Sequence, residues 1–586
     1  MQMNIAAPLL LGLIVFYLGY RYYGRLLSGI FGENDDNTTP AVALKDDVDY
    51  VPTPLGVAFS HHFASIAGAG PIIGPVAALI FGYAPVWAWI ILGTVFFGAV
   101  HDYTALFVSM RENGRSVADV ANNYLGRFGF FLFISFTIIM IVLVTSAFLG
   151  LTAVSLTSMV PLKHLALSGG SCLLKTVSVN GVQSARIGGI ASTSVIFITL
   201  FAPLIGWLLY VKKIKVWIAS VAAVIICVLS VAVGLTFPIS LDPQKWMIIL
   251  SIYVVIAAGV PVWLVLQPRD FMNSFILYAG ILMLLTGVIG GGFGGLTLHA
   301  PAFNLAQGSD KLGLIWPFLF ITVACGAISG FHALVAGGTV SKQAERESHA
   351  RKIGFGAMIL EGIMALVVLL TIAGGLKFDT YMSIVYPLQG KSNPILAFAL
   401  AMGTLLHNAI KVPVSLGTVF GILMVEGFVI TTLDTAVRLN RYLFEELWAI
   451  IFTRVPRIMK SYLFNSLLSA ALMLWLAKTN AFMVIWPIFG TANQLLAALT
   501  LIAVSVWLAY RGKPTLITLI PAAFMMVTTL ASLYILLVNN YLPAKNMPLI
   551  AADLLLMILS VGVIYIAIRR LTGIVSERGK VATAVQ

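Results

Sequence analysis

The chain has 586 residues, of which 60% are hydrophobic and only 10% are charged. A soluble domain carries about 25% charged residues, so this composition excludes a water-soluble protein and predicts an integral membrane protein. The net charge of +13 does not indicate a nucleic-acid partner, because the basic residues are scattered through short connections and form no stripe.

The first apolar run, MQMNIAAPLLLGLIVFYLGYRYYGR, has no Lys or Arg before it, so we expect a retained helix with its N-terminus outside rather than a signal peptide. Long apolar runs recur to the end of the chain, which predicts an all-α polytopic protein rather than a barrel of short alternating strands. We expect about fifteen transmembrane helices, near residues 4–22, 56–82, 84–110, 128–154, 187–210, 216–237, 246–268, 271–292, 312–338, 354–375, 413–437, 461–477, 481–509, 514–538 and 546–568.

The distribution of basic residues supports this arrangement. With the N-terminus outside and fifteen alternating spans, 25 of the 35 Lys and Arg residues fall in cytoplasmic connections, as positively charged loops prefer. This parity requires that the apolar stretch 394–410 does not cross, so we expect an outer helix or a re-entrant loop there. The predicted location is the plasma (inner) membrane of a prokaryote, with a cytoplasmic C-terminus.

The stretch FSHHFASIAGAGPIIGPVAALIFG (59–82) is apolar enough to span, yet glycines and prolines interrupt it. Backbone groups freed inside lipid need other partners, and a carrier can provide them through its cargo, because half-helix ends and bare carbonyls bind anions and cations. A second span, LGLIWPFLFITVACGAISGFHALVAGG (312–338), is also glycine-rich and also carries a histidine. Packing of small residues is the alternative explanation for each span.

Under the predicted parity the two interrupted spans run in opposite directions, which is typical of transporters with inverted repeats. The span 246–268 also contains an interruption, so it remains an alternative start for the second repeat. We expect no soluble domain and the following division of one membrane domain: 1–55 N-terminal helix and cytoplasmic loop, 56–240 first repeat, 241–311 inserted helix pair, 312–510 second repeat with the outer segment 394–410, and 511–586 C-terminal helices and tail.

Six long motifs closely resemble the carbon starvation protein A family, over most of the chain and in the expected order: HHFASIAGAGPIIGP (61–75), GAVHDYTALFVSMRENGRS (98–116), WLVLQPRDFMNSF (263–275), CGAISGFHALVAGGTVSKQ (325–343), TTLDTAVRLNRYLFEE (431–446) and WPIFGTANQLLAALTL (486–501). The resemblance implies membership of the amino acid–polyamine–organocation superfamily and a LeuT-like 5+5 inverted repeat with discontinuous helices. It also implies uptake of peptides or pyruvate during carbon starvation.

The paired interruptions predict where cargo binds. We expect the substrate-binding residues to be His61, His62, Ser65, Gly68, Gly70, Cys325, Ser329 and His332. Histidine titrates near neutral pH and suits proton coupling, whereas a metal site at the adjacent histidines lacks an evident third ligand. A structural, hydrogen-bonded role for the two histidines is the alternative.

Coupling-ion residues are expected at Ala67, Gly70, Asp102, Thr431, Thr432 and Asp434. Asp102 lies inside a span, where a carboxylate must be paired or protonated, so it can carry a proton or pair permanently with a base. The likeness to LeuT-type carriers implies that Thr431, Thr432 and Asp434 lie beside the carbonyls of Ala67 to Gly70. The alternative for Asp434 is an ion pair with Arg438, one turn away.

Other intramembrane polar residues have both functional and structural explanations. Glu361 and Glu426 are mid-span carboxyl groups and therefore functional candidates, with bundle packing as the alternative. Arg269 and Asp270 are expected to form a structural pair in a short inner loop. Asn493 and Gln494 are expected to bond across helices.

These features favour a secondary active transporter that imports peptides or small carboxylates such as pyruvate by alternating access. A channel or a membrane-embedded enzyme is the alternative, but no filter-like repeat and no catalytic constellation is evident. The phosphate-binding motif GxxxxGK[ST] is absent from the sequence. We therefore expect a small-molecule or peptide substrate, a lipid bilayer, H⁺ or Na⁺ as the coupling ion, and neither nucleotide, nucleic acid, metal nor cofactor.

Overall fold

The computed structural model describes residues 3–46, 50–165, 174–179, 181–261, 264–388, 392–480 and 482–585, most of which are helical. Apolar runs form the long helices, and polar or proline residues begin several of them: the Ser116 hydroxyl accepts a hydrogen bond from the Asp119 N–H, and Pro243 follows the capping residue Asp242. The first twelve α-helices are α1 Ala6–Leu18, α2 Gly24–Phe31, α3 Pro40–Ala43, α4 Leu55–Ile66, α5 Gly70–Ala78, α6 Tyr83–Gly93, α7 Ala99–Arg111, α8 Val117–Ser155, α9 Ile187–Gly206, α10 Val216–Thr236, α11 Pro243–Gly259 and α12 Leu266–Phe293.

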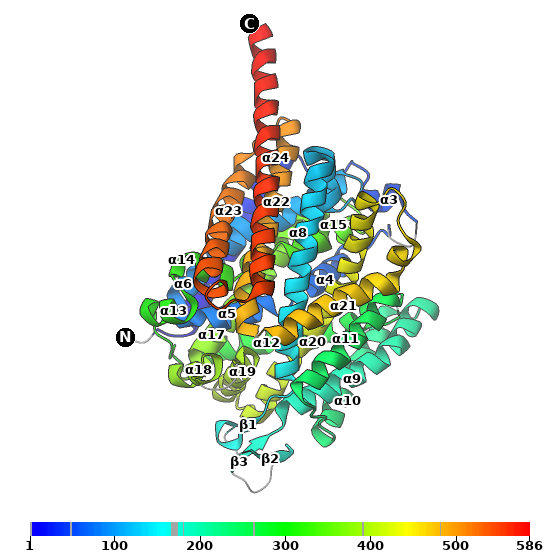
Figure 1. Cartoon of the computed structure of the whole chain (residues 1–586). Coiled ribbons are helices and arrows are strands. Elements are labelled where there is room, and N and C mark those ends of the chain that lie inside the picture. The colour runs from blue at the N-terminus through cyan, green and yellow to red at the C-terminus, as the bar shows by residue number, and fades with distance from the viewer. Residues whose placement is uncertain are drawn as a thin grey trace.

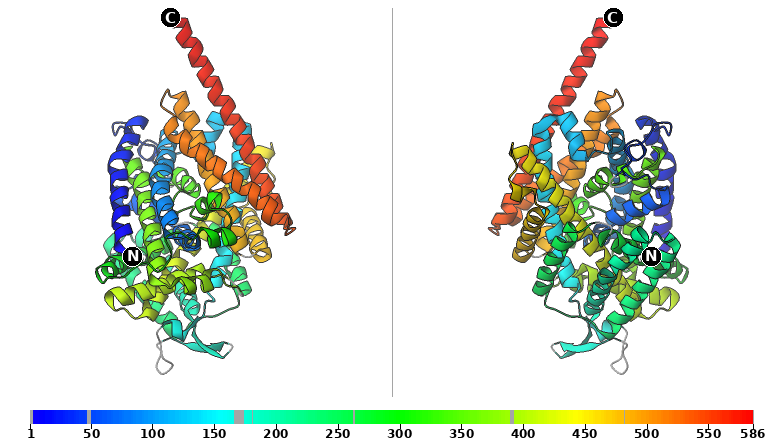
Figure 2. Two further views of the ribbon diagram at one scale, coloured as in Figure 1. Left: turned by 90° about the vertical axis from the view of Figure 1, so that its left-hand side faces the viewer. Right: turned by 90° about the vertical axis from the view of Figure 1, so that its right-hand side faces the viewer.

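The second half of the chain is helical in the same way. Its α-helices are α13 Leu305–Leu312, α14 Ile315–Thr322, α15 Phe331–Gly338, α16 Ser348–Ala350, α17 Gly356–Gly375, α18 Phe378–Val385, α19 Pro394–Ile410, α20 Val414–Ile451, α21 Tyr462–Thr479, α22 Phe482–Tyr510, α23 Leu516–Leu536 and α24 Met547–Val585. Helix α24 continues beyond the other helices at one end of the molecule (Figures 1 and 2).

A small antiparallel sheet lies at the opposite end (Figure 1). It consists of β1 Val160–Pro161, β2 Thr176–Val179 and β3 Val182–Ala185, in the order β1-β3-β2. The sequence prediction of an all-α protein did not include it. Four-residue strands are too short to give a periodic pattern, so this error has a simple physical reason.

Among the described residues, eleven helices are long and apolar enough to cross a membrane, or twelve when the bent pair 58–66 and 70–81 is counted as one span. All fifteen predicted spans overlap helices, but the exact number of crossings stays a prediction, as does the inverted repeat. Segments 246–268 and 394–410 correspond to α11 and α19, each of only 17 residues. Helix α19 packs against α20, α12 and α17, so it is a helix buried in protein.

The core fills the space between the helices, and it includes most residues of the two interrupted spans. Helix α22 crosses the centre of the bundle: the most apolar 18-residue stretch within 483–510 is entirely buried. Helices α8, α20 and α23 pack around α22 or around each other, whereas α10 and α24 expose most of their apolar surface. This arrangement places polar groups of α7, α15, α17 and α22 in the interior, away from lipid.

Candidate functional site

Both predicted interruptions are present. Helix α4 ends at Ile66 and α5 begins at Gly70, with the two axes bent by 40°. Helix α14 ends at Thr322 and α15 begins only at Phe331. Pro71 occupies the first turn of α5, where its missing N–H costs no hydrogen bond, so the prolines and glycines of this segment place the break where it occurs.

The two interruptions touch each other. A methyl group added at Gly70 would lie 2.4 Å from the Cys325 sulfur, and one added at Gly74 would lie 2.8 Å from the Thr322 carbonyl oxygen. Only glycine permits this approach of one break to the other. The contact favours the span 312–338 over 246–268 as the partner of the first break.

A cavity of about 1000 Å³ opens at one end of the bundle, and Lys311 and Lys478 lie at its wall. Its lining comes from connections that the parity places outside. Phe318, near the N-terminal end of α14, lines this cavity. Helix α5 approaches the cavity with its C-terminal end, because the Ala77 carbonyl accepts a hydrogen bond from Tyr386 in the cavity wall. The two broken helices therefore run in opposite directions, as predicted.

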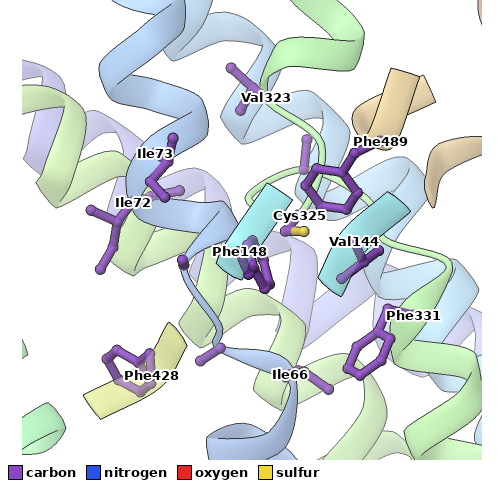
Figure 3. Packing of buried hydrophobic residues seen from close by; sticks show 14 of the residues in the cluster. Ile66, Ile72, Ile73, Val144, Phe148, Val323, Cys325, Phe331, Phe428 and Phe489 are labelled. Atoms are coloured by element: carbon purple, nitrogen blue, oxygen red, sulfur yellow. The ribbon is translucent and has the colours of Figure 1, made fainter. Parts of the chain in front are cut away.

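Two aromatic side chains lie on the helices that lead from this cavity toward the breaks. Gly150 of α8 and Pro487 of α22 line the cavity. Phe148 and Phe489, deeper on the same two helices, are in edge-to-face contact with ring centroids 5.6 Å apart. Figure 3 shows both rings beside Cys325, with Ile66 and Ile72 of the first break nearby. This aromatic pair thus lies between the cavity wall and the breaks.

The opposite end is closed by polar contacts. The Glu347 carboxylate accepts hydrogen bonds from Arg111 at 2.9 Å and from the Asn34 N–H at 2.9 Å, and its side chain is only 5% exposed. Asp35 accepts two hydrogen bonds from Ser348. Partial burial would raise the pKa of Asp35, but these hydrogen bonds outweigh it and lower the pKa, so the carboxylate stays charged near neutral pH.

Groups from neighbouring helices form hydrogen bonds with part of the second break. Asn493 of α22 accepts hydrogen bonds from the Gly330 N–H with its backbone carbonyl and from the Phe331 N–H with its side chain, both at 3.0 Å. Thr94 donates to the Gly326 carbonyl at 3.0 Å, and Gln494 donates to the Phe320 carbonyl at 2.6 Å. The cross-helix role predicted for Asn493 and Gln494 is therefore confirmed. The N–H groups of Ala324, Cys325, Gly326 and Ser329 have no hydrogen-bond partner among the described residues.

The first break also has unpaired backbone groups. Within the described part of the chain, no hydrogen-bond partner is present for the Ala69 N–H or the Ala67 carbonyl. The Ser65 hydroxyl donates to the His61 carbonyl of its own helix at 2.8 Å. Gly68 lies against Thr432, whose hydroxyl oxygen would be 2.8 Å from an added methyl group. The predicted proximity of Thr432 to this break is thus confirmed.

A buried polar cluster links α7, α15 and α17 next to the second break. Asp102 of α7 contacts His101 through one oxygen at 2.7 Å and His332 of α15 through the other at 2.8 Å. The second ring nitrogen of His332 lies 3.3 Å from Glu361 of α17. His62 of α4 is completely buried, with Asp102 and His332 as its nearest charged neighbours. Five residues from four helices that are remote in sequence therefore lie in one cluster.

Asp434 has a different partner from the one considered in the sequence. Its carboxylate binds the guanidinium of Arg269 through two contacts, at 2.6 and 3.1 Å, and accepts a hydrogen bond from Tyr253 at 2.8 Å. Arg438 instead donates to the carbonyls of Ala257 and Val260.

The inner-loop placement of Arg269 was also wrong, because α12 begins at Leu266 and Arg269 is buried in its first turn. Arg269 does contact Asp270 at 3.5 Å, as predicted. The second residue of the expected cation site, Thr431, accepts a hydrogen bond from Asn273 at 3.2 Å. Asp434 is thus paired with a buried arginine in this structure, and its predicted role in ion coupling stays a prediction.

The remaining expected residues lie at the break or behind it. Ser329 and Cys325 both receive hydrogen bonds from the Asn493 amide, at 3.0 and 3.4 Å. Glu426 is fully buried on α20, with the Ser155 hydroxyl as its polar neighbour. In the described segments, no three His, Cys, Asp or Glu side chains form a group that could hold a metal ion.

Known proteins resemble this chain in sequence and in fold. The "Peptide transporter CstA" of Bacillus subtilis (strain 168) is 31% identical over 92% of this chain and 92% of its own length. The "Pyruvate/proton symporter BtsT" of Escherichia coli (strain K12) is 28% identical over 88% and 79%. Among solved structures, a manganese transporter from Eremococcus coleocola matches 90% of this chain and 99% of its own at 11% identity, with a TM-score of 0.48.

A family model described as "Carbon starvation protein CstA" matches residues 4–390 and 383–532. Together these two matches extend from the first helix into α23, so they include both interruptions and the buried cluster. The resemblance drawn from the six motifs is therefore confirmed: the chain belongs to the carbon starvation protein CstA family.

Proposed function

We propose that the protein is a secondary active transporter that imports peptides or small carboxylates such as pyruvate by alternating access, driven by H⁺ or Na⁺. The observation that carries this proposal is the contact between two oppositely directed, interrupted helices at Gly70 and Cys325. The relatives named as a peptide transporter and as a pyruvate/proton symporter support the same class of cargo.

The two ends of the molecule support alternating access. The ring pair Phe148 and Phe489 lies deeper than the lining of the cavity on the predicted outer side, and polar contacts around Glu347 join segments at the predicted cytoplasmic end. A transporter that exposes its binding site to one side at a time requires one closure on each side of that site. Opening of the aromatic pair connects the breaks with the outer cavity, and opening of the polar end connects them with the cytoplasm.

Carboxylate is the chemical group that the proposed cargoes share. The first break leaves the N–H of Ala69 unpaired at the start of α5, where N–H groups and the helix dipole favour an anion. Both pyruvate and the C-terminus of a peptide carry such a group. The apolar surroundings, including Ile72, Phe148 and Phe428, suit the rest of a small organic molecule (Figure 3).

Counterflow in proteoliposomes tests the proposal. Vesicles loaded with unlabelled pyruvate or unlabelled dipeptide are diluted into the labelled compound, and gradients of H⁺ and of Na⁺ are imposed separately in parallel assays. We expect transient accumulation of at least one label, and further accumulation with one of the two ion gradients. Equilibration without counterflow would identify a channel, and conversion of the label to another compound would identify an enzyme. Protein-free vesicles are the control.

A further inference from the structure

Within the buried cluster, the charge of the Glu361 carboxyl group is poorly compensated. We propose that Glu361 and His332 together hold the proton that drives transport, and that Asp102 is their positioning residue. This inference rests on the proposed function, because it assigns the coupling ion and its site within the same transporter. The three residues come from α17, α15 and α7, and each is at most 1% exposed.

Asp102 is held as an anion by two imidazole groups. One oxygen lies 2.7 Å from Nδ1 of His101 and the other lies 2.8 Å from Nδ1 of His332. A buried carboxylate that accepts a hydrogen bond at each oxygen is stabilised in its charged form. The same bond fixes the tautomer of His332, with the proton of Nδ1 toward Asp102 and with Nε2 directed at Glu361.

One proton fits between His332 and Glu361. The Nε2 atom lies 3.3 Å from Oε2 of Glu361, within ion-pair distance, and neither this nitrogen nor the two Glu361 oxygens make a hydrogen bond among the described residues. Either His332 is cationic and pairs with a Glu361 carboxylate, or Glu361 is protonated beside a neutral His332. In both forms Asp102, His332 and Glu361 have a net charge of −1.

Loss of that proton is strongly unfavourable in the closed structure. The Nε2 lone pair then faces a carboxylate, and the three side chains carry a net charge of −2 in a dry interior. The proton therefore enters from water on one side and leaves to water on the other, when the corresponding end of the transporter opens. No bond other than N–H or O–H forms or breaks in this step.

The neighbouring elements add no compensating cation. His332 and Asp102 are the charged groups that act on Glu361, and Asp102 and Glu361 are those that act on His332. His62 approaches from α4, and both of its ring nitrogens lack a hydrogen-bond partner among the described residues. The nearby polar group on α22 is the neutral amide of Asn493. It donates a hydrogen bond to Ser329, three residues before His332. His101 completes the set on α7.

The cluster is linked to the cargo site by Cys325. Glu361 acts electrostatically on Cys325, and Cys325 contacts Gly70 of the first break. An anionic cargo at the breaks is repelled more by a cluster charge of −2 than by −1. Proton and cargo carboxylate therefore favour each other's binding, and this reciprocity is the requirement for symport.

Other buried ionisable residues do not share these properties. Asp434 is neutralised by Arg269 through two contacts. Among the described residues, the Ser155 hydroxyl is the polar neighbour of Glu426, and no histidine or charged group there acts as a base with which it could exchange a proton. Glu361 is the carboxyl group that combines a proton-accepting partner with proximity to the breaks.

The decisive variant is Glu361→Gln, which keeps the shape of the side chain and cannot release a proton. For whichever of pyruvate or the dipeptide the wild type exchanges, we expect counterflow at equal pH to persist and accumulation driven by an inward H⁺ gradient to be lost. The apparent affinity of the wild type weakens by up to about tenfold per pH unit on the alkaline side, as linkage to one proton requires, and that of the variant stays constant. Asp553→Asn, a buried carboxyl group on the peripheral helix α24, is the matched control and keeps both properties.

Two outcomes overturn the inference: proton-driven accumulation by Glu361→Gln, or an unchanged pH dependence of its affinity. A wild type without counterflow would instead contradict the proposed function, so the two failures are distinguishable. Should the variant not fold, substrate is added to purified wild type in weakly buffered solution. Uptake of about one proton per bound molecule is expected, and no uptake overturns the inference.

Discussion

Gly70 shows how strongly one residue can be constrained by a partner that is remote in sequence. Its hydrogen atom faces Cys325, 255 positions further along the chain, at a distance that excludes any larger side chain. The sequence predicted an interruption here from glycine and proline content, because those residues weaken or end helices whatever surrounds them. The identity of the contacting residue depends on tertiary packing, which the local pattern does not contain.

The contact predicts a specific pair of variants. Gly70→Ala places a methyl group 2.4 Å from the Cys325 sulfur and 2.5 Å from its Cβ, so the breaks are forced apart. Overpacking of this kind costs about 1–3 kcal/mol, and we expect counterflow to slow on the order of tenfold or more. Cys325→Gly removes the clashing atoms and restores much of the rate to the double variant. Counterflow rates of the four proteins measure this coupling, and an additive double variant would contradict the contact.

The ion-pair partner of Asp434 could not be identified from sequence spacing. Arg438 is one helical turn away and was the natural partner to consider, but the ion pair forms with Arg269, 165 positions earlier. Asp102 and His332 are likewise 230 positions apart. Mid-span charges were recognisable from the sequence as costly and therefore functional or paired, whereas which base pairs with which acid required the fold.

At the scale of helices, α22 supplies what the broken α14–α15 segment lacks. Its Asn493 and Gln494 satisfy backbone groups of the second break, and Phe489, one turn earlier, contributes to the outer closure. The sequence located most helices because twenty apolar residues in a row predict a span. It placed the ends of α20 and α24 too early, since amphipathic continuations beyond the membrane lack that signal.

The outer closure predicts the effect of removing one ring. An aromatic pair contributes about 0.5–1.5 kcal/mol beyond its buried area, so Phe148→Ala shifts the equilibrium toward the open cavity by up to about tenfold. We expect a membrane-impermeant maleimide, applied from outside, to modify Cys325 faster by a similar factor. Phe197→Ala, which removes a ring from the Phe197–Phe201 pair on peripheral α9, is the control and leaves the rate unchanged. Equal rates in the wild type and Phe148→Ala would show that these rings do not limit access.

For the whole molecule, the arrangement is a cavity at one end, a polar closure at the other, and the touching breaks between them. Composition predicted the membrane protein, and charge bias predicted which connections share a side. The connections that the charge bias assigns to the outside surround one cavity, so the charge distribution and the structure agree. The cavity itself could not be predicted, because its wall combines segments from six parts of the chain.

Protection of Cys325 from modification tests most directly whether cargo binds at the touching breaks. In a variant with Cys172→Ser and Cys227→Ser, Cys325 is the remaining thiol, and its reaction with a membrane-permeant maleimide is followed with and without the transported compound. The account predicts that cargo slows the reaction, with half-protection at the concentration that half-saturates transport. An unchanged reaction rate at concentrations that saturate transport would contradict it.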